Sequence, residues 1–486
     1  MKTASLLAFT LLVSACSPAP VAEPVAQAGA PVKISITTKS PEALTHFQRG
    51  EALLENLRTT EAVEELNQAL KLDPEFAAAK SFRGFATPGP EGLKEMEAAT
   101  LAASTLPEAE RVLIEGNAAN RRGDLEKARS SYRRVIELAP TDFLGHYLLG
   151  QQLLGDQKYA DAAASLRKAT ELNPTAGGAQ NMLGYAALRQ GDTSGAIAAF
   201  EQYAKILPQE PNAHDSLGEA LLGAGKFQEA EAAFQKSLEV SPQFWAAHEG
   251  MAYTKLYRGD WAGGKAALVK AKETATRWAD KIQVDDELVA VAVAQRNTAQ
   301  ALKMIDAIEK TVGPQPSDVA FEPLRRGQVL LDAGRAKEAL APIATALTAA
   351  DSGKLPVALS RNLRREALRA RVAAEAQTSD AAAAQKTSAA LDADAAARAD
   401  DPQAQTAMHF GRAMLAVAQR DAKGAQAQFD QCSHEDQVCL WQAVVSAEKA
   451  GDKSAAGTAR DTLLKVYARD PGHLIIRSRL ATSGAS

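Results

Sequence analysis

Residues 177–208 read GGAQNMLGYAALRQGDTSGAIAAFEQYAKILP, and this stretch decides the fold. In its first half, Leu183 and Ala187 are four positions apart, which places them on one face of a helix. In its second half, the apolar positions again recur every four residues, at Ala196, Phe200 and Ala204. A glycine-containing turn separates the halves, and Pro208, which cannot continue a helix, ends the second. The stretch therefore predicts two amphipathic helices packed against each other.

The pattern returns along the chain with a period of 33 or 34 residues, since prolines close successive periods at positions 74, 107, 140, 174, 208 and 242. A small residue midway in the first helix recurs at Gly50, Gly116, Gly150, Gly184 and Gly218. A larger residue in the second helix recurs at Leu66, Tyr132, Leu166, Phe200 and Phe234. A helix pair cannot bury its apolar face alone, so the pairs are expected to stack on one another.

Length and composition agree with a stack of helices. The chain has 486 residues, too many for one ordinary compact core. Hydrophobic residues make up 46% but aromatic residues only 5%, because much of the apolar content is alanine, which favours helix over strand. The formal net charge is −4 and no long run of one charge sign appears, so the sequence predicts no nucleic-acid partner.

The repeat resembles the tetratricopeptide repeat, in which two helices carry small and large residues at these positions. The resemblance implies an all-α fold, an α-solenoid of antiparallel helix pairs wound into a superhelix. It covers residues 41–276 as about seven repeats and weakens over residues 277–475, which are expected to be helical but divergent. Residues 476–486 are expected to form a tail. The family's aromatic residue near the start of the first helix is mostly missing, and histidines stand there instead.

The N-terminus predicts export and lipid attachment. A basic start precedes a short apolar run, too short to span a bilayer but typical of a signal peptide, here residues 1–15. The run ends in Val13-Ser14-Ala15-Cys16, which resembles the bacterial lipobox. By that resemblance Cys16 becomes the lipidated first residue of the mature protein. The alternative is an ordinary signal peptide followed by a chance cysteine.

The residues after Cys16 bear on location. Residues 16–40 are rich in proline and alanine and are expected to form a flexible tether. The residue directly after the cysteine is Ser17, whereas an aspartate at this position would resemble an inner-membrane retention signal. The resemblance therefore implies a lipid-anchored protein of the bacterial envelope, on the periplasmic face of the outer membrane.

The resemblance also predicts the binding surface, because the first helix of each tetratricopeptide pair lines a concave groove that holds a peptide or a partner helix. The residues on the free face of the first helices are Asn117, Tyr147, Gln151, Asn181, Tyr185, Asp215, Glu219, Glu249 and Tyr253. The alternative is that these are solvated positions with some packing between repeats. Family members that grip acidic chaperone tails use basic residues, whereas Asp215, Glu219 and Glu249 would repel such a tail. A basic or mostly apolar ligand fits this groove better.

Few residues suggest chemistry. Asp192 lies in a motif that resembles an aspartic-protease turn, but aspartates recur at the same place in other repeats, where they cap the second helix. Cys432 and Cys439 are the two cysteines left after lipidation of Cys16. In an oxidising compartment they are expected to form a disulfide, with inert thiols or a metal site that uses His434 as alternatives. No catalytic residue, metal site, cofactor or small-molecule substrate is predicted.

These features together predict a non-enzymatic scaffold or adaptor, anchored by lipid, that binds another envelope protein or a peptide segment in its groove. Such lipoproteins resemble assembly factors for pili, secretion channels or outer-membrane proteins. One alternative is self-association, with the divergent C-terminal half docking onto another copy. The other is an enzyme with a site in roughly the last 200 residues.

Overall fold

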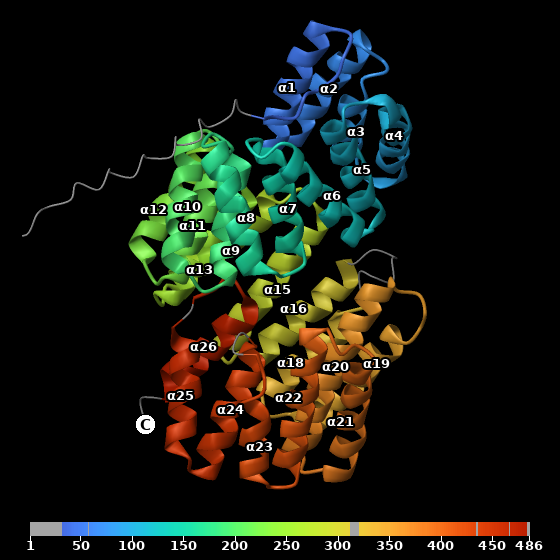
Figure 1. The fold of residues 1–486 in the computed structure, drawn as a ribbon. Helices are drawn as coiled ribbons and strands as arrows, with labels where there is room; N and C mark the ends of the chain where they lie inside the picture. Colours follow the sequence, from blue (N-terminus) through green and yellow to red (C-terminus); the bar gives the residue numbers. More distant parts are fainter. Residues whose placement is uncertain (1–31, 57, 312–319, 434–435, 466, 484–486) are drawn as a thin grey trace, which may run out of the picture. The chain divides into compact units, whose positions relative to one another are not determined.

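The structure is a computed structural model that describes residues 32–311 apart from residue 57, 320–433, 436–465 and 467–483. Within these residues the chain forms helices and no β-strand, and the helices come in antiparallel pairs (Figure 1). This confirms the predicted all-α solenoid of helix pairs. The predicted signal peptide, Cys16 and the first part of the tether lie outside the described residues. Among the described helices, none is both long and apolar enough to cross a bilayer.

The chain divides into two compact units. Unit 1 comprises residues 1–152 and 171–173, and unit 2 comprises residues 153–170 and 174–486. The helices that begin in unit 1 are α1 (Pro41–Glu55), α2 (Thr59–Leu72), α3 (Ala77–Ala86), α4 (Gly89–Ala102), the 3₁₀ helix η1 (Ala103–Thr105), α5 (Glu108–Arg122), α6 (Leu125–Leu138) and α7 (Phe143–Gly155).

Unit 2 continues the alternation of first and second helices. The repeats of the regular period are α8 (Tyr159–Leu172), α9 (Gly177–Arg189), α10 (Thr193–Ile206), α11 (Pro211–Gly223), α12 (Phe227–Val240), α13 (Trp245–Tyr257) and α14 (Trp261–Thr274). The divergent part contains α15 (Trp278–Ala294), α16 (Thr298–Thr311), α18 (Glu322–Asp332), α19 (Ala336–Ala350), α20 (Val357–Gln377), α21 (Ala381–Ala396), α22 (Pro402–Ala418), α23 (Ala422–Phe429), α24 (Gln437–Ala450), α25 (Lys453–Leu464) and α26 (Pro471–Ser483).

In three of the regular pairs the turn between the helices is built from glycine and aspartate, with Asp124, Asp192 or Asp260 as the cap of the second helix. Gly191 has φ +77°, a left-handed conformation that glycine adopts without steric cost. Asp192 then caps α10, because its Oδ1 accepts a hydrogen bond from the Gly195 amide at 2.9 Å. Asp260 caps α14 in the same way through the Gly263 amide. The aspartate of the protease-like motif is therefore a helix cap.

The core follows the repeat pattern of small and large residues. The large positions of the second helices are fully buried: Leu66, Tyr132, Leu166, Phe200 and Phe234. Gly184 shows why the facing position must be small, since a Cβ there would lie 2.5 Å from the Phe200 ring. A methyl group at this position would overlap the ring, so the close approach of α9 and α10 requires glycine.

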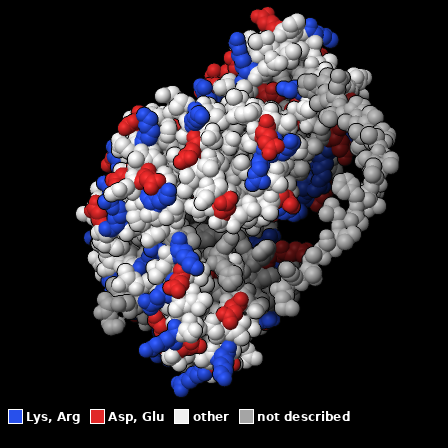
Figure 2. All heavy atoms as spheres, turned by 60° about the vertical axis from the view of Figure 1, so that its left-hand side comes forward, with Lys and Arg blue, Asp and Glu red and all other residues white. Residues whose placement is uncertain are grey.

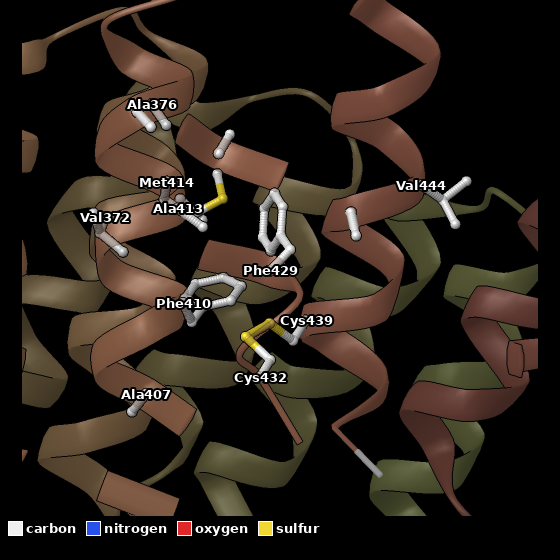
Figure 3. Close-up of a cluster of buried hydrophobic side chains, with 14 of the residues drawn as sticks. Val372, Ala376, Ala407, Phe410, Ala413, Met414, Phe429, Cys432, Cys439 and Val444 are labelled. Carbon is white, nitrogen blue, oxygen red and sulfur yellow. A yellow bond between two sulfur atoms is a disulfide. The ribbon is translucent and has the colours of Figure 1, made fainter. Parts of the chain in front are cut away.

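The divergent C-terminal part also folds as stacked helix pairs, around a core of its own. Figure 3 shows this core, in which Phe410, Phe429 and Met414 lie close to the yellow bond between Cys432 and Cys439. The two cysteines form a disulfide, and both side chains are buried. The bond joins the end of the α22–α23 pair to the start of α24. The alternative ligand His434 lies outside the described residues.

Two of the expected boundaries differ from the structure. Residues 476–486 were expected to be a tail, but α26 extends to Ser483 and buries Leu480. Residues 32–40 were expected to belong to the flexible tether, but they run in extended conformation along unit 1. Their backbone amides donate hydrogen bonds to carboxylates of unit 1. The Ile34 amide donates to Asp142 at 3.2 Å, and the Thr37 amide donates to Glu110 at 3.0 Å.

Candidate functional site

The first helices α9, α11, α13 and α15 of unit 2 form one continuous surface, which we call the first-helix face. The 34-residue period places Tyr185, Glu219 and Tyr253 at equivalent positions on successive helices. The structure brings such positions into contact, since the Tyr185 hydroxyl lies 3.1 Å from Ser216 Oγ and 3.4 Å from Glu219 Oε2. Ser216 Oγ in turn donates to Asn181 Oδ1 at 3.3 Å. These residues form a polar network along the first-helix face.

The same step along the sequence reaches two further residues that the sequence analysis missed. A 34-residue step from Glu249 and Tyr253 leads to Gln283 and Glu287 on α15. Gln283 Nε2 donates to Glu249 Oε1 at 2.9 Å and to Glu287 Oε1 at 3.3 Å. The period itself could have identified both residues, because the equivalence holds even where the apolar pattern of the repeat weakens.

The centre of the first-helix face is occupied by Arg469, which lies between α25 and α26. Its Nη1 and Nη2 each donate to one carboxylate oxygen of Asp215, both at 3.2 Å. Nη2 also donates to Glu219 Oε2 at 2.6 Å, and Nη1 to the Ala246 carbonyl at 3.1 Å. Glu249 Oε2 completes the cluster, 3.6 Å from Nη1. One buried guanidinium thus faces three carboxylates, a geometry that suits the planar fork of arginine.

The carboxylates outnumber the single guanidinium, and their burial shows in their protonation. Burial raises the pKa of Asp215 to about 6, against the opposing effect of Arg469. Burial, together with the hydrogen bond and the charge of Glu249, raises the pKa of Glu287 to about 10. Glu287 is therefore protonated near neutral pH and able to donate a hydrogen bond to Glu249. The site retains excess negative charge and favours a cationic group.

Two aromatic residues contact the chain around Arg469, Tyr257 of the first helix α13 and Phe227 of the second helix α12. The Tyr257 hydroxyl donates to the Ala468 carbonyl at 2.6 Å. The Tyr467 ring packs edge-on against Tyr257 and Phe227, with centroid distances of 5.2 and 4.8 Å. The Arg477 guanidinium lies over the other side of Tyr467, 3.7 Å from its centroid. Residues 467–470, which form no regular secondary structure, are thus bound through their side chains and their backbone.

Helix α26 extends this contact along α15. Leu474 is buried there, and Ile475 packs against the same core of α15 side chains. Arg479 Nη2 donates to the Val293 carbonyl in the last turn of α15 at 2.8 Å and pairs with Asp332 of α18. A cation at a helix C-terminus is electrostatically favourable. Residues 467–481 therefore cover much of the first-helix face.

This occupancy changes how the predicted groove residues are understood. Asp215, Glu249 and Tyr253 were expected to lie on a free face open to a partner, but each is less than 5% exposed. They are covered because the chain's own C-terminal segment lies over them. No pattern in the sequence indicates this contact, since Arg469 stands in an ordinary polar stretch, Tyr-Ala-Arg-Asp, far from the repeats that it contacts.

The predicted groove residues of unit 1 are Asn117, Tyr147 and Gln151, and the structure brings them together around one cavity. Asn117 is buried and its polar atoms are engaged, since it donates to Ser81 Oγ and accepts from the Tyr132 hydroxyl at 3.2 Å. The cavity also contains two glutamates that the sequence analysis did not single out, Glu51 and Glu55.

On the face that Figure 2 shows, basic and acidic side chains are interspersed. Within the described ranges, no group of three or more histidine, cysteine, aspartate or glutamate side chains has an arrangement able to hold a metal ion.

A stack of antiparallel helix pairs defines a class by its fold, the α-helical repeat proteins. Within that class, models of the tetratricopeptide repeat match residues 43–76, 113–142, 147–211 and 211–244. The chain therefore contains tetratricopeptide repeats, as its sequence pattern predicted.

Solved structures with similar folds share low sequence identity with the chain. "Crystal structure of MamA" is 23% identical, with a TM-score of 0.31, and the match covers 33% of this chain and 93% of that one. "Crystal structure of YrrB: a TPR protein with an unusual peptide-binding site" is 20% identical, with a TM-score of 0.33, and covers 38% and 95%. A tetratricopeptide repeat protein from Parabacteroides merdae is 17% identical, with a TM-score of 0.42, and covers 54% and 99%. Comparison with curated protein sequences gives no match.

Proposed function

We propose that this protein is a non-enzymatic scaffold of the bacterial envelope, anchored by lipid at Cys16, that binds a partner protein or peptide through the first helices of its tetratricopeptide repeats. The observation that carries the proposal is the occupied first-helix face of unit 2. There the repeats contact the short non-helical segment between α25 and α26 through a side chain, Arg469, and through a backbone carbonyl, that of Ala468. A surface that binds its own chain in this way has the chemistry to bind another polypeptide.

Two features support the envelope location. The Val13-Ser14-Ala15-Cys16 sequence resembles a lipobox, and several acyl chains hold a protein on a membrane firmly, whereas one chain binds reversibly. The disulfide between Cys432 and Cys439 suits an oxidising compartment such as the periplasm. The outer membrane is proposed because Ser17 follows the cysteine.

Lipid attachment is tested by metabolic labelling with an alkyne fatty acid. We expect the native protein to be labelled and to fractionate with the outer membrane, and the Cys16→Ala variant to be neither labelled nor retained there. A Cys16→Ala variant that is labelled as strongly as the native protein would contradict the anchor.

Partner binding is tested by crosslinking in intact cells. A photo-crosslinking amino acid replaces Gln151, which lines the cavity of unit 1. The matched control carries it at Lys127, an exposed residue of the second helix α6. We expect position 151 to capture one discrete envelope protein that position 127 does not. Equal capture at both positions, or none at either, would argue against binding by the first helices.

Self-association is separated from this proposal by light scattering of the purified protein. A mass equal to one chain at all concentrations supports the scaffold with a foreign partner. A mass that rises with concentration, together with capture of the same protein at position 151, would instead favour docking between copies.

A further inference from the structure

Unit 1 contains a cavity of about 260 Å³ among its first helices α1, α3, α5 and α7. Its walls are largely apolar and aromatic and include Phe82, Phe85 and Tyr147. Glu51 and Glu55, one helical turn apart on α1, bring two carboxylates to this apolar space. Pockets for whole small molecules usually measure about 300–1,000 Å³, so a cavity of this size suits one long side chain.

Neither Glu51 nor Glu55 forms an ion pair with the described part of the chain, although the charge of Lys33 acts on Glu51. Glu55 is only 8% exposed, lines the cavity, and makes no hydrogen bond or ion pair with the described part of the chain. The nearby Asp142 adds further negative charge, and Lys33 is the one cation with an opposing effect on Glu51. A buried carboxylate without a partner is unfavourable, and such groups are normally paired. The site is therefore incomplete as it stands.

The missing charge shows in the protonation of both groups. Burial, with repulsion from Glu55 and Asp142, raises the pKa of Glu51 to about 8. Burial and Asp142 raise the pKa of Glu55 to about 7. A cation placed between them would favour the ionised forms and release protons.

Unit 2 shows what such a carboxylate cluster accepts in this protein. There the guanidinium of Arg469 lies among Asp215, Glu219 and Glu249, with its carbon 5.7 Å from the centroid of the Phe234 ring. The cavity of unit 1 offers the same combination, carboxylates beside aromatic rings, on equivalent helices of the repeat. It differs in that no arginine of the described chain enters it.

We propose that the unit 1 cavity is a binding site for an arginine side chain of a partner polypeptide. The guanidinium would pair with Glu51 and Glu55, and its aliphatic stem would pack against Phe82, Phe85 and Tyr147. Arginine suits the site better than lysine because its planar group pairs with two carboxylates at once and stacks on aromatic rings. This inference rests on the proposed function and specifies the partner's chemistry.

The test uses the full-length protein and a labelled peptide, acetyl-Ala-Leu-Arg-Leu-Ala, followed by fluorescence anisotropy. The control peptide carries glutamine in place of arginine. The variant is Glu51→Gln with Glu55→Gln, which keeps side-chain shape and removes both charges. Its matched control is Glu137→Gln, which removes an exposed carboxylate from the second helix α6 of the same unit. Circular dichroism verifies that both variants fold.

We expect the arginine peptide to bind at least tenfold more tightly than the glutamine peptide. The double variant should lose at least tenfold in affinity, and Glu137→Gln should stay within twofold. Affinity should rise between pH 6 and pH 9, by up to about tenfold per pH unit for each proton released. Calorimetry in two buffers of different ionisation enthalpy should detect this proton release.

Equal binding of the two peptides, or an unchanged affinity in the double variant, would overturn the inference. So would Mg²⁺ or Ca²⁺ that binds at the two glutamates and displaces the arginine peptide, since the site would then be a metal site. A different result contradicts the proposed function, namely equal capture at positions 151 and 127 or no capture at either. If position 151 captures a partner whose contact region has no arginine, the proposed function stands and this site assignment is wrong.

Discussion

Replacing Arg469 with methionine removes a buried guanidinium while keeping much of the side-chain volume. The substitution deletes four hydrogen bonds, two to Asp215, one to Glu219 and one to the Ala246 carbonyl. It also leaves Asp215 and Glu249, which are 3% and 4% exposed, without a counter-charge. Removing one member of a buried ion pair typically costs about 3–5 kcal/mol. We expect a loss of this size in the docking of residues 467–481.

The pH dependence of this loss has a definite sign. The pKa of Asp215 is about 6 even with the arginine present, so without it the carboxyl takes up a proton more readily. A protonated Asp215 needs no counter-charge. The destabilisation should therefore be larger at pH 8 than at pH 5.5, where protonation offsets part of the loss.

Hydrogen exchange followed by mass spectrometry measures this docking directly, because it reports local opening in a protein with several units. Residues 467–481 and α11 should lose protection together in Arg469→Met. The control is Arg335→Met, which breaks an exposed pair with Glu338 and should leave the protection of residues 467–481 unchanged. Protection of residues 467–481 that matches the control, or a loss that is equal at pH 5.5 and pH 8, would refute the reasoning.

Three further predictions follow from the contacts of the two units. Unit 1 should lose stability as the pH rises from 5 to 8, by at most about 1.4 kcal/mol per pH unit, because Glu51 has a native pKa of about 8 and keeps a proton that the unfolded chain releases. Glu51→Gln should reduce this pH dependence. Hydrogen exchange of α1, corrected for intrinsic rates, measures it. Gly184→Ala should destabilise its repeat by about 1–3 kcal/mol, measured by hydrogen exchange of α9 and α10, because the added methyl meets the Phe200 ring. Reduction of the bond between Cys432 and Cys439 should lower protection of α23 and α24 by about 2–3 kcal/mol, from the entropy of the short loop that the bond closes.

Each of these predictions has a matched control. Glu137→Gln, an exposed carboxylate, should leave the pH profile of unit 1 unchanged. Gly457→Ala lies in α25 with no atom within 4 Å of the added methyl, so it should be neutral or stabilise by up to about 1 kcal/mol. Reducing agent should leave α9 and α10 unchanged. A Gly184→Ala variant as stable as Gly457→Ala would show that the close helix contact is not as tight as described.

Much of the fold was predictable because its determinants are local and repeated. The period places Gly184 against Phe200, and the turn between the two helices places Asp192 at the N-terminus of α10, and each of these contacts spans fewer than 20 residues. The same period aligned Tyr185, Glu219 and their equivalents along one face. It would also have predicted Gln283 and Glu287, had it been extended past the last strong repeat.

Tertiary structure alone decided that Arg469 occupies the first-helix face of unit 2 and that Glu51 and Glu55 line a cavity of unit 1. Arg469 reaches Asp215 across 254 residues, and nothing in the periodic pattern marks it, because its own surroundings resemble any solvated turn. The surroundings of Glu51 and Glu55 are likewise set by the other helices that line the cavity, not by the position of the two residues on α1. A repeat fixes which side chains face the groove. Whether a carboxylate there meets water, its own chain or a partner depends on long-range packing, which leaves no periodic signal in the sequence.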